Sequence, residues 1–520
     1  MLKLEMKTYK KTILIVLLFF YISINLFYLS RFPFIHSDES WLSGLSRNIM
    51  ETSNYSSTEP FFDLMPRHPH AIKILFHTLQ ILFIKIMGYN IFTVRLISLI
   101  FGLITLIWFY KLSKLLFHSK NNALASTMLL AFDIQFIYAT HFARQEIIIL
   151  FFLIFALHFI LSHIENIQTC HHIILGTIIG LAIGFHPNSF IISLPLGLIY
   201  LFHIFVTKKL KLSGLIIFIS TTACFATVFV ILSLFMDPNF VQNYANLGHN
   251  FGVFNSIPNK ITEITDFYNK LYNSVSGTYY TPNIKFQFIL FSLVMLGTIY
   301  NLFRSKNNPE NEKIATIVLA IFAINMGIII IGRYNQTSIV FIFPFFYLLT
   351  IYVLNNLKKS LKWFAITLLC FILATSTLLN ALPYINNNYN TYLKEISKTV
   401  GKNNIVLANL NADYYFDNGA LHDFRNLAFL QEENLNFEQY IEEKKIEYII
   451  YPEEMDLIYQ QRPRWNSLYG NLYPYYDDMQ KFFQTKCKLV YRFENPTYGI
   501  RIARYVNTKN WEIRIYKVIR

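Results

Sequence analysis

The chain has 520 residues, of which 54% are hydrophobic and only 15% are charged, and its formal net charge is +14. This composition lies outside the range of soluble globular proteins, so we predict an integral membrane protein. The basic residues are spread over short segments between apolar runs and form no single basic patch, which argues against binding of nucleic acid. No nucleic acid is therefore expected among the partners.

Apolar stretches recur along most of the chain, and crossing a bilayer takes roughly 20 such residues. Eleven stretches are predicted as spans: 12–30, 91–110, 123–140, 145–163, 173–186, 188–206, 213–236, 285–303, 314–332, 337–354 and 361–380. The run 72–87 is also apolar, but polar side chains such as Lys73 and Lys85 leave it one polar face. We expect it to form a helix in the membrane interface.

Lysine and arginine set the expected orientation, because they collect in short cytoplasmic loops. If 72–87 does not cross, every basic cluster falls on one side of the membrane. These clusters lie within residues 3–11, 111–120, 208–211, 304–313 and 358–362. The N-terminus is then cytoplasmic and the C-terminus is extracytoplasmic.

Two domains are expected from a change in composition near residue 385. Residues 1–384 form a membrane domain with two long outside loops, residues 31–90 and 237–284. Loops of this length commonly carry function, so both are expected to contribute to a site. Residues 385–520 have frequent, nearly balanced charges, which predicts a soluble α/β domain on the extracytoplasmic side.

Within this second domain, the Asn-rich segment INNNYNTY is predicted to be a linker. Strands are expected at 403–410 and 447–454, with an amphipathic helix at 436–446 between them. The segments CKLVYRF, GIRIARYV and WEIRIYKVI predict further strands.

The first long loop opens with two adjacent carboxylates, Asp38 and Glu39. Ser37 is suited to cap a helix there, which would rest an apolar face running from Trp41 to Ile49 on the membrane. Two roles are open for the carboxylates. They cap this helix, whose dipole stabilises anions, or one of them takes a proton from a hydroxyl or holds a metal ion.

Five motifs follow one another along the chain: HSDESW, RHPHAIKILF, GYNIFTVRLISLIFG, THFARQE and GFHPNS. In this order they resemble the multispan glycosyltransferases of the protein O-mannosyltransferase and lipid A aminoarabinose transferase type. The likeness covers roughly residues 10–355. It implies the GT-C membrane fold, a polyprenyl-phosphate sugar as donor, and a lipid, glycan or protein as acceptor.

The resemblance also assigns residues. Asp38 matches the catalytic aspartate of that family, with Glu39 as its neighbour. His68 and Lys73 stand in the stretch that matches a His-Pro-Pro motif, although His70 replaces the second proline. The family's stretch begins an interfacial helix, in agreement with the placement of 72–87.

Arg95 matches an arginine of the family, and Arg144 with Glu146 matches an Arg-x-acid element. Sugar transfer leaves a phosphate monoester, so cations must meet the developing charge, and Lys73, Arg95 and Arg144 are the candidates. Asp38 would be the base on the opposite face of the sugar, and attack without a protein nucleophile inverts the anomeric centre.

Structural alternatives remain for these cations. Arg95 can snorkel to the interface, Lys73 can contact lipid headgroups, and Arg144 can form an ion pair with Glu146 between spans.

Two further polar residues are weaker candidates for the site. Asp133 is expected to face a polar cavity or to cap a helix, because a carboxylate facing lipid is costly. His186 precedes a proline that is expected to break the chain between two spans.

Motifs of nucleotide-binding folds and zinc hydrolases are missing, which argues against a nucleotide donor. No cofactor is certain, and a divalent cation beside Asp38 and Glu39 stays open. The expected location is a bacterial inner membrane. The alternative is a polytopic transporter or lipid-linked sugar flippase, although such proteins show half-repeats and midplane charges, whereas here the charges gather at the outer surface. A non-catalytic scaffold would explain the C-terminal domain but not the carboxylate loop.

Overall fold

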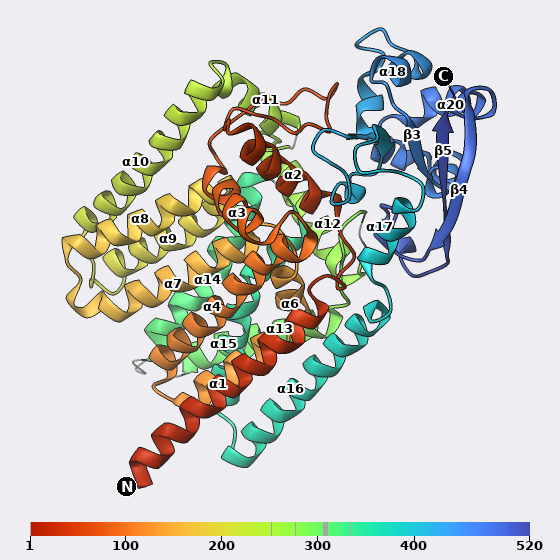
Figure 1. Cartoon of the computed structure of the whole chain (residues 1–520). Helices are drawn as coiled ribbons and strands as arrows, with labels where there is room; N and C mark the ends of the chain where they lie inside the picture. The colour runs from red at the N-terminus through yellow and green to blue at the C-terminus, as the bar shows by residue number, and fades with distance from the viewer. Residues whose placement is uncertain (1, 251, 276, 305–309, 333, 520) are drawn as a thin grey trace.

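The computed structural model describes residues 2–250, 252–275, 277–304, 310–332 and 334–519. Lys306 of one predicted basic loop lies outside the described residues. Helices fill the first three quarters of the chain, and the sheet lies near the C-terminus (Figure 1). The membrane domain contains α1 (Leu2–Tyr28), α2 (Ser37–Thr52), α3 (Ile74–Met87), α4 (Ile91–Phe117), α5 (Lys120–Ala131), α6 (Ile134–Thr140), α7 (Glu146–His163), α8 (Thr169–Phe185), α9 (Phe190–Phe205), α10 (Leu212–Met236), α11 (Phe240–Asn250), α12 (Ile257–Tyr272), α13 (Lys285–Arg304), α14 (Glu310–Ile331), α15 (Phe343–Leu354) and α16 (Lys359–Ala381).

The multi-span prediction is confirmed by length and composition. Among the described residues, 8 helical stretches could cross a membrane, or up to 9 if the bent pair α5 and α6 is one span. The shorter apolar helices Thr12–Tyr28 and Thr169–Phe185 coincide with the two remaining predicted spans. The run predicted to lie in the interface forms α3.

The predicted span 123–140 is not one straight helix, because α5 and α6 meet at an angle of 70°. Asp133 caps α6 by accepting hydrogen bonds from the backbone N–H groups of Gln135 and Phe136. Its second carboxylate oxygen accepts a hydrogen bond from the Tyr347 hydroxyl at 2.7 Å. Asp133 therefore takes the capping role that was one of its two expected roles.

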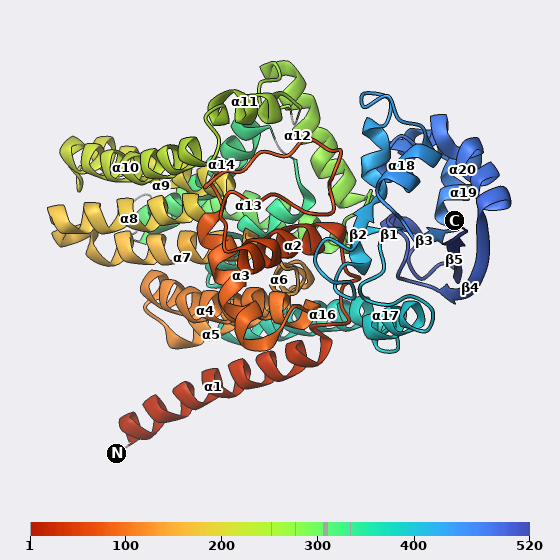
Figure 2. The same cartoon turned by 45° about the horizontal axis from the view of Figure 1, so that its top comes forward.

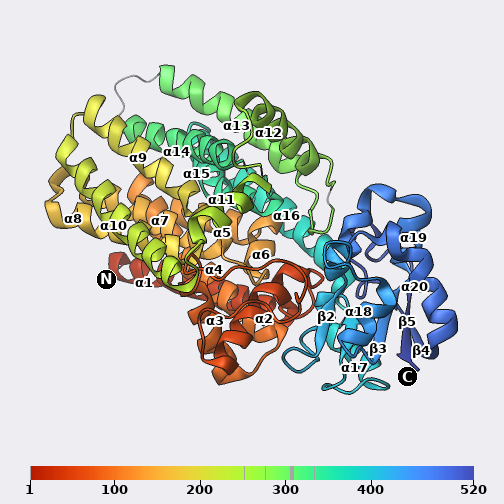
Figure 3. The ribbon, with the colours of Figure 1, turned by 90° about the horizontal axis from the view of Figure 1, so that it is seen from above.

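The loops predicted to be cytoplasmic meet at one face of the molecule. Lys209 Nζ donates to Glu312 Oε2 at 2.8 Å, and Lys313 Nζ donates to His118 Nε2 at 3.1 Å. The N-terminus of α1 and the C-terminal domain lie at opposite ends of the molecule in all three views (Figures 1, 2 and 3). The side of the membrane on which each end lies stays a prediction.

The C-terminal region is an α/β domain around one mixed sheet with the strand order β2-β1-β3-β5-β4. β1 pairs in parallel with β2 and β3, while β5 pairs antiparallel with β3 and β4. Its elements are α17 (Tyr389–Ser397), β1 (Val406–Ala408), β2 (Leu421–Asp423), α18 (Phe437–Glu443), β3 (Tyr448–Pro452), α19 (Glu454–Gln461), α20 (Leu472–Lys486), β4 (Cys487–Asn495) and β5 (Trp511–Val518).

Two local predictions for this domain are wrong. The segment GIRIARYV forms no strand, because the backbone N–H groups of Arg501 and Ile502 donate to the buried carboxylate of Glu454 and not to a neighbouring strand. The expected linker is partly helical, since α17 begins at Tyr389, and the rings of Tyr389 and Tyr392 are buried in the core.

The C-terminal domain lies at one end of the helical region, beside α2 and far from α8 and α9 (Figures 2 and 3). α4 and α7 pack against each other, and α4 begins after Asn90, whose side chain caps it. Arg95 lies near the start of α4, and Glu146 is the first residue of α7. Arg95 binds Glu39 in the first turn of α2, and Glu146 binds Arg144, which in turn binds Asp38.

Candidate active site

The start of α2 is held by a reciprocal cap. The Nδ1 atom of His36 accepts a hydrogen bond from the backbone N–H of Asp38 at 3.0 Å, and Glu39 Oε2 accepts one from the N–H of His36 at 3.0 Å. The cap is therefore His36, and the expectation for Ser37 is wrong by one residue. This geometry fixes both carboxylates in the first turn, as predicted.

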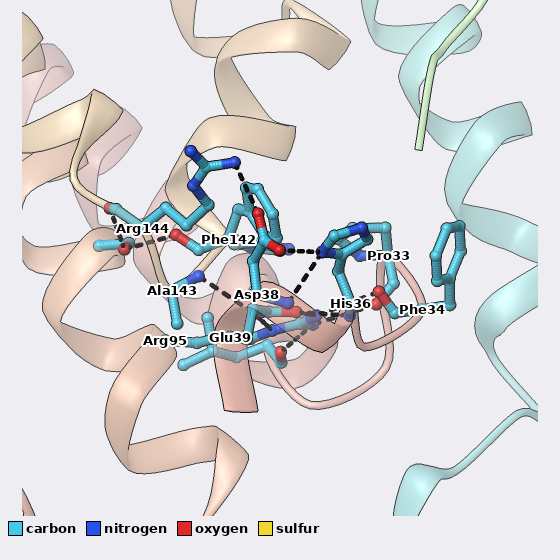
Figure 4. Close-up of polar contacts among 12 residues, drawn as sticks. Pro33, Phe34, His36, Asp38, Glu39, Arg95, Phe142, Ala143 and Arg144 are labelled. Carbon is cyan, nitrogen blue, oxygen red and sulfur yellow. Dashed lines mark hydrogen bonds and ion pairs between the residues drawn. The ribbon is translucent and has the colours of Figure 1, made fainter. Parts of the chain in front are cut away.

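Asp38 is held by two groups that are distant in the sequence. Arg144 Nη1 donates to Asp38 Oδ2 at 3.0 Å, and the Tyr279 hydroxyl donates to the same oxygen at 2.6 Å. The Asp38 side chain retains 23% exposure. Figure 4 shows Arg144 and His36 on either side of its carboxylate, while Glu39 points toward Arg95.

The protonation states at the start of α2 follow from these contacts. Burial raises the pKa of Asp38, but the His36 ring, the Arg144 cation and the Tyr279 hydroxyl outweigh burial and hold it well below its usual range. Burial lowers the pKa of His36 to about 4, so this ring is neutral at neutral pH. Arg144 and Tyr279 are therefore the groups that keep Asp38 ionised there.

Glu39 and Arg95 form a buried ion pair. Arg95 Nε and Nη2 donate to the two oxygens of Glu39 at 2.7 and 2.8 Å, and both side chains are 0% exposed. The remaining guanidinium hydrogens bind the backbone carbonyls of Leu29, Phe32, Pro33 and Phe34. Glu39 also accepts the N–H of Ala143 at 3.0 Å.

The contacts of the Glu39–Arg95 pair argue against the roles that were expected for both residues. Glu39 is enclosed by its partners and has no face toward a substrate, and the donors of Arg95 are turned to Glu39 and to backbone carbonyls. We therefore no longer propose Glu39 as a proton acceptor or Arg95 as a phosphate ligand. The pair joins α2 to α4 and to the segment before α7, which fixes the position of Asp38.

Arg144 has two carboxylate partners. Its Nη2 lies 3.1 Å from Glu146 Oε1, while its Nη1 binds Asp38. The ion pair with Glu146 was expected as the alternative to phosphate binding, and it is present, whereas the contact with Asp38 was not predicted. Thr337 donates a hydrogen bond to Glu146 Oε1 at 2.9 Å and so holds the Glu146 carboxylate in place. Glu146 then orients the Arg144 guanidinium toward Asp38.

A pocket of about 260 Å³ opens beside Asp38. Five residues predicted from the sequence line it: Asp38, His68, Lys73, Arg144 and His186. Glu39, Arg95, Asp133 and Glu146 are not among its lining residues. The apolar residues Trp41, Leu42, Leu45 and Ile49 of α2 face this pocket, so the expectation that they rest on the membrane is wrong.

Comparison with known proteins identifies the fold class of the chain. The family model described as dolichyl-phosphate-mannose-protein mannosyltransferase matches residues 67–233. ArnT from Cupriavidus metallidurans in the apo state is similar with a TM-score of 0.59 and 10% identity over 97% of this chain and 98% of that one. The chain has the GT-C fold.

Two further GT-C structures are similar. ArnT from Cupriavidus metallidurans bound to undecaprenyl phosphate gives a TM-score of 0.54 and 11% identity, covering 95% of this chain and 97% of that one. The Archaeoglobus fulgidus oligosaccharyltransferase in complex with Zn and sulfate gives 0.53 and 14%, covering 85% and 68%. A search of curated protein sequences finds no significant match. The family match and the shared GT-C fold indicate a glycosyltransferase.

Two histidines of this GT-C protein occupy the pocket wall in different ways. His68 accepts a hydrogen bond from the Asn243 side chain at 3.1 Å, so the second long loop contacts the first. His186 caps the short 3-10 helix Pro187–Ser189 by accepting the N–H of Asn188 at 2.9 Å. The predicted chain break between α8 and α9 is confirmed, and the break brings His186 to the pocket.

Other pocket residues of the GT-C domain were missed in the sequence. Tyr279 was not singled out, although the loop that carries it was expected to contribute to the site. Arg67 is the first residue of the motif RHPHAIKILF, and it donates two hydrogen bonds of 2.8 and 2.7 Å to the carboxylate of Glu59. Glu59 also accepts a hydrogen bond from Trp41 Nε1 at 2.6 Å. No sequence pattern indicated these partners.

The carboxylate pair does not suit a divalent cation. Glu39 is turned to Arg95, and Asp38 Oδ2 is covered by Arg144 and Tyr279, whereas Mg²⁺ and Ca²⁺ prefer several converging oxygen ligands. Within the part of the chain that the structure describes, no three His, Cys, Asp or Glu side chains are grouped to hold a metal ion.

Proposed function

We propose that this protein transfers one sugar from a polyprenyl-phosphate donor to a hydroxyl of a lipid, glycan or protein acceptor, with inversion at the anomeric carbon. The reaction takes place on the extracytoplasmic face of a bacterial inner membrane. The observation that carries the proposal is the position of Asp38 at a pocket that Arg144 and Lys73 also line. The ArnT neighbour bound to undecaprenyl phosphate supports this class of donor.

The base in this reaction is Asp38. Its Oδ2 is occupied by Arg144 and Tyr279. The Nδ1 atom of the neutral His36 ring lies 3.5 Å from Oδ1, and among the described residues no hydrogen bond is made to Oδ1. Oδ1 is therefore the atom for an acceptor hydroxyl. A carboxylate with a low pKa is a weak base at rest, but the acceptor proton becomes more acidic as its oxygen bonds to the anomeric carbon.

The leaving group is the polyprenyl phosphate. As the acceptor oxygen bonds to the anomeric carbon, the bond from that carbon to the phosphate oxygen breaks, and the electron pair stays on the phosphate. The acceptor proton passes to Asp38. Lys73 lines the same pocket and meets the charge that develops on the phosphate. The Nη atoms of Arg144 bind Asp38 and Glu146, so Arg144 adds its positive charge from beside Asp38 and not as a direct ligand.

Replacing Lys73 by Ala is expected to weaken binding of undecaprenyl phosphate about tenfold, which corresponds to about 1.4 kcal/mol. The reason is the loss of one cation from the pocket, while Arg144 remains. The matched control is Lys85→Ala, because Lys85 is an exposed lysine on α3 that does not line the pocket. Fluorescence titration with a labelled undecaprenyl phosphate measures both variants. Equal affinity of the Lys73 variant and the wild type would remove Lys73 from the proposed site.

The rate of transfer is expected to vary by less than about twofold between about pH 8 and pH 5. The base must be ionised, and because the pKa of Asp38 is held below its usual range, ionisation is lost only at still lower pH. Initial rates with saturating donor test this. Tyr279→Phe removes one hydrogen bond to the carboxylate and should shift the acid limb to higher pH. A wild-type rate that already falls above about pH 5 would contradict the assignment of Asp38.

A further inference from the structure

α2 has a second face, opposite the pocket, that lies against the C-terminal domain. Arg47 Nη2 donates to Asp413 Oδ1 at 3.0 Å, and Arg47 Nη1 donates to the carbonyl of Phe416 at 2.8 Å. The Tyr89 hydroxyl, just before α4, donates to Asp413 Oδ2 at 2.5 Å. Arg47 is 5% exposed and Asp413 is 1% exposed, so this contact is shielded from water.

Two weaker hydrogen bonds extend the same contact along α2. The hydroxyls of Ser43 and Tyr414 are 2.9 Å apart, and Asn418 donates to Asn48 at 2.8 Å. The approach is close at Gly44, where a Cβ atom would lie 2.6 Å from the Phe61 ring and 3.2 Å from Asp413 Oδ2. Side chains larger than glycine do not fit there without movement.

The C-terminal domain also holds the segment between α2 and α3. The carbonyl of Phe61 accepts hydrogen bonds from the backbone N–H of Asp423 at 3.1 Å and from the Asn426 side chain at 2.9 Å. The guanidinium of Arg425 lies 4.9 Å from the ring centre of Trp41, which lines the pocket. The chain then runs on to Arg67 and Lys73 in the pocket wall.

A third segment carries Tyr279, the hydrogen-bond donor to Asp38. The backbone N–H of Ala503 donates to the carbonyl of Gly277 at 3.0 Å. Thr278 in turn pairs with His36 Nε2 at 2.9 Å, next to the cap of α2. Three of the segments that line the pocket around Asp38 therefore each bind the C-terminal domain.

We propose that the C-terminal domain is the support that positions the catalytic segments, and that Asp413 is the positioning residue for α2 and so for Asp38. This inference rests on the proposed function of Asp38. A buried ion pair that is also hydrogen-bonded fixes direction as well as distance. A shift of a catalytic group by about 1 Å can cost about 10²-fold in rate, so a helix held at one point can limit turnover.

The test compares Asp413→Asn with Tyr415→Phe in full-length protein in nanodiscs. Tyr415 is a matched control, because its hydroxyl donates to the Val400 carbonyl inside the C-terminal domain and not to α2. We expect Asp413→Asn to lower kcat at least about tenfold while the Kd for undecaprenyl phosphate stays within about twofold. Tyr415→Phe should change neither value by more than about twofold. An unchanged kcat in the Asp413→Asn variant would overturn the proposal.

Hydrogen exchange of the backbone amides gives a readout that does not depend on turnover. In the Asp413 variant, amides of residues 37–50 should exchange faster, while those of α7 should not change. If the wild type transfers no sugar, the proposed function fails, and the exchange result alone decides the positioning role. Unchanged exchange in α2 overturns it. If Asp413→Asn does not fold, Tyr414→Phe removes only the hydroxyl that contacts Ser43, and the same two readouts apply.

Discussion

Replacing Asp38 by Asn is expected to lower kcat by about 10³-fold, within the usual range for loss of a general base. The amide oxygen still accepts hydrogen bonds from Arg144 and Tyr279, so the pocket keeps its shape. The Kd for undecaprenyl phosphate should stay the same or decrease, because a carboxylate that repels the phosphate has been neutralised. Single-turnover rates and a binding titration measure these two effects separately.

The matched control for this prediction is Asp266→Asn, the same substitution at an exposed aspartate of the second long loop. It should change neither kcat nor Kd. Transfer by the Asp38 variant at more than about a tenth of the wild-type rate would show that another group is the base.

Glu39→Ala is expected to have a different effect from any substitution of its neighbour. It leaves Arg95 charged and fully buried without its partner, which should cost about 3–5 kcal/mol in the free energy of unfolding. Asp38→Ala removes a side chain that is 23% exposed, so it should cost far less. Equilibrium unfolding of both variants in the same detergent makes the comparison.

The informative quantity is the loss in free energy of unfolding of Glu39→Ala compared with that of Asp38→Ala. If Glu39→Ala and Asp38→Ala destabilise the protein equally, the Glu39–Arg95 pair does not hold the site together. Arg95→Met with Glu39→Leu should regain much of the lost stability, because replacing both partners leaves no unpaired buried charge. Activity should still be low in this double variant, since the hydrogen bond from Ala143 to Glu39 is lost as well.

The sequence predicted the spans well, because long apolar runs have few alternatives in a membrane. It also predicted Asp38, Lys73 and Arg144 around one site, since motif order along a known fold carries that information. It could not distinguish a lipid-facing helix from one that lines a pocket, because an apolar face on α2 suits both. The residues from Trp41 to Ile49 were misplaced for this reason.

Prediction from the sequence also failed for interaction partners that lie far apart along the chain. The Tyr279 hydroxyl is 241 residues from Asp38, and Asp413 is 366 residues from Arg47. Arg95 looked like a phosphate ligand because only the fold shows that Glu39 and four carbonyls occupy its guanidinium. GIRIARYV alternates like a strand, but Glu454 binds the amides that a strand would need.

Transfer of a lipid-linked sugar with Asp38 as the base can be tested in one assay. Purified protein in nanodiscs is incubated with radiolabelled undecaprenyl-phosphate sugars and a crude envelope acceptor, and wild type is compared with Asp38→Asn. We expect label to leave the lipid carrier with the wild type and to stay on it with the variant. If folded wild type moves no lipid-linked sugar in this series, the account is contradicted, and a transporter or scaffold becomes the better explanation of the fold.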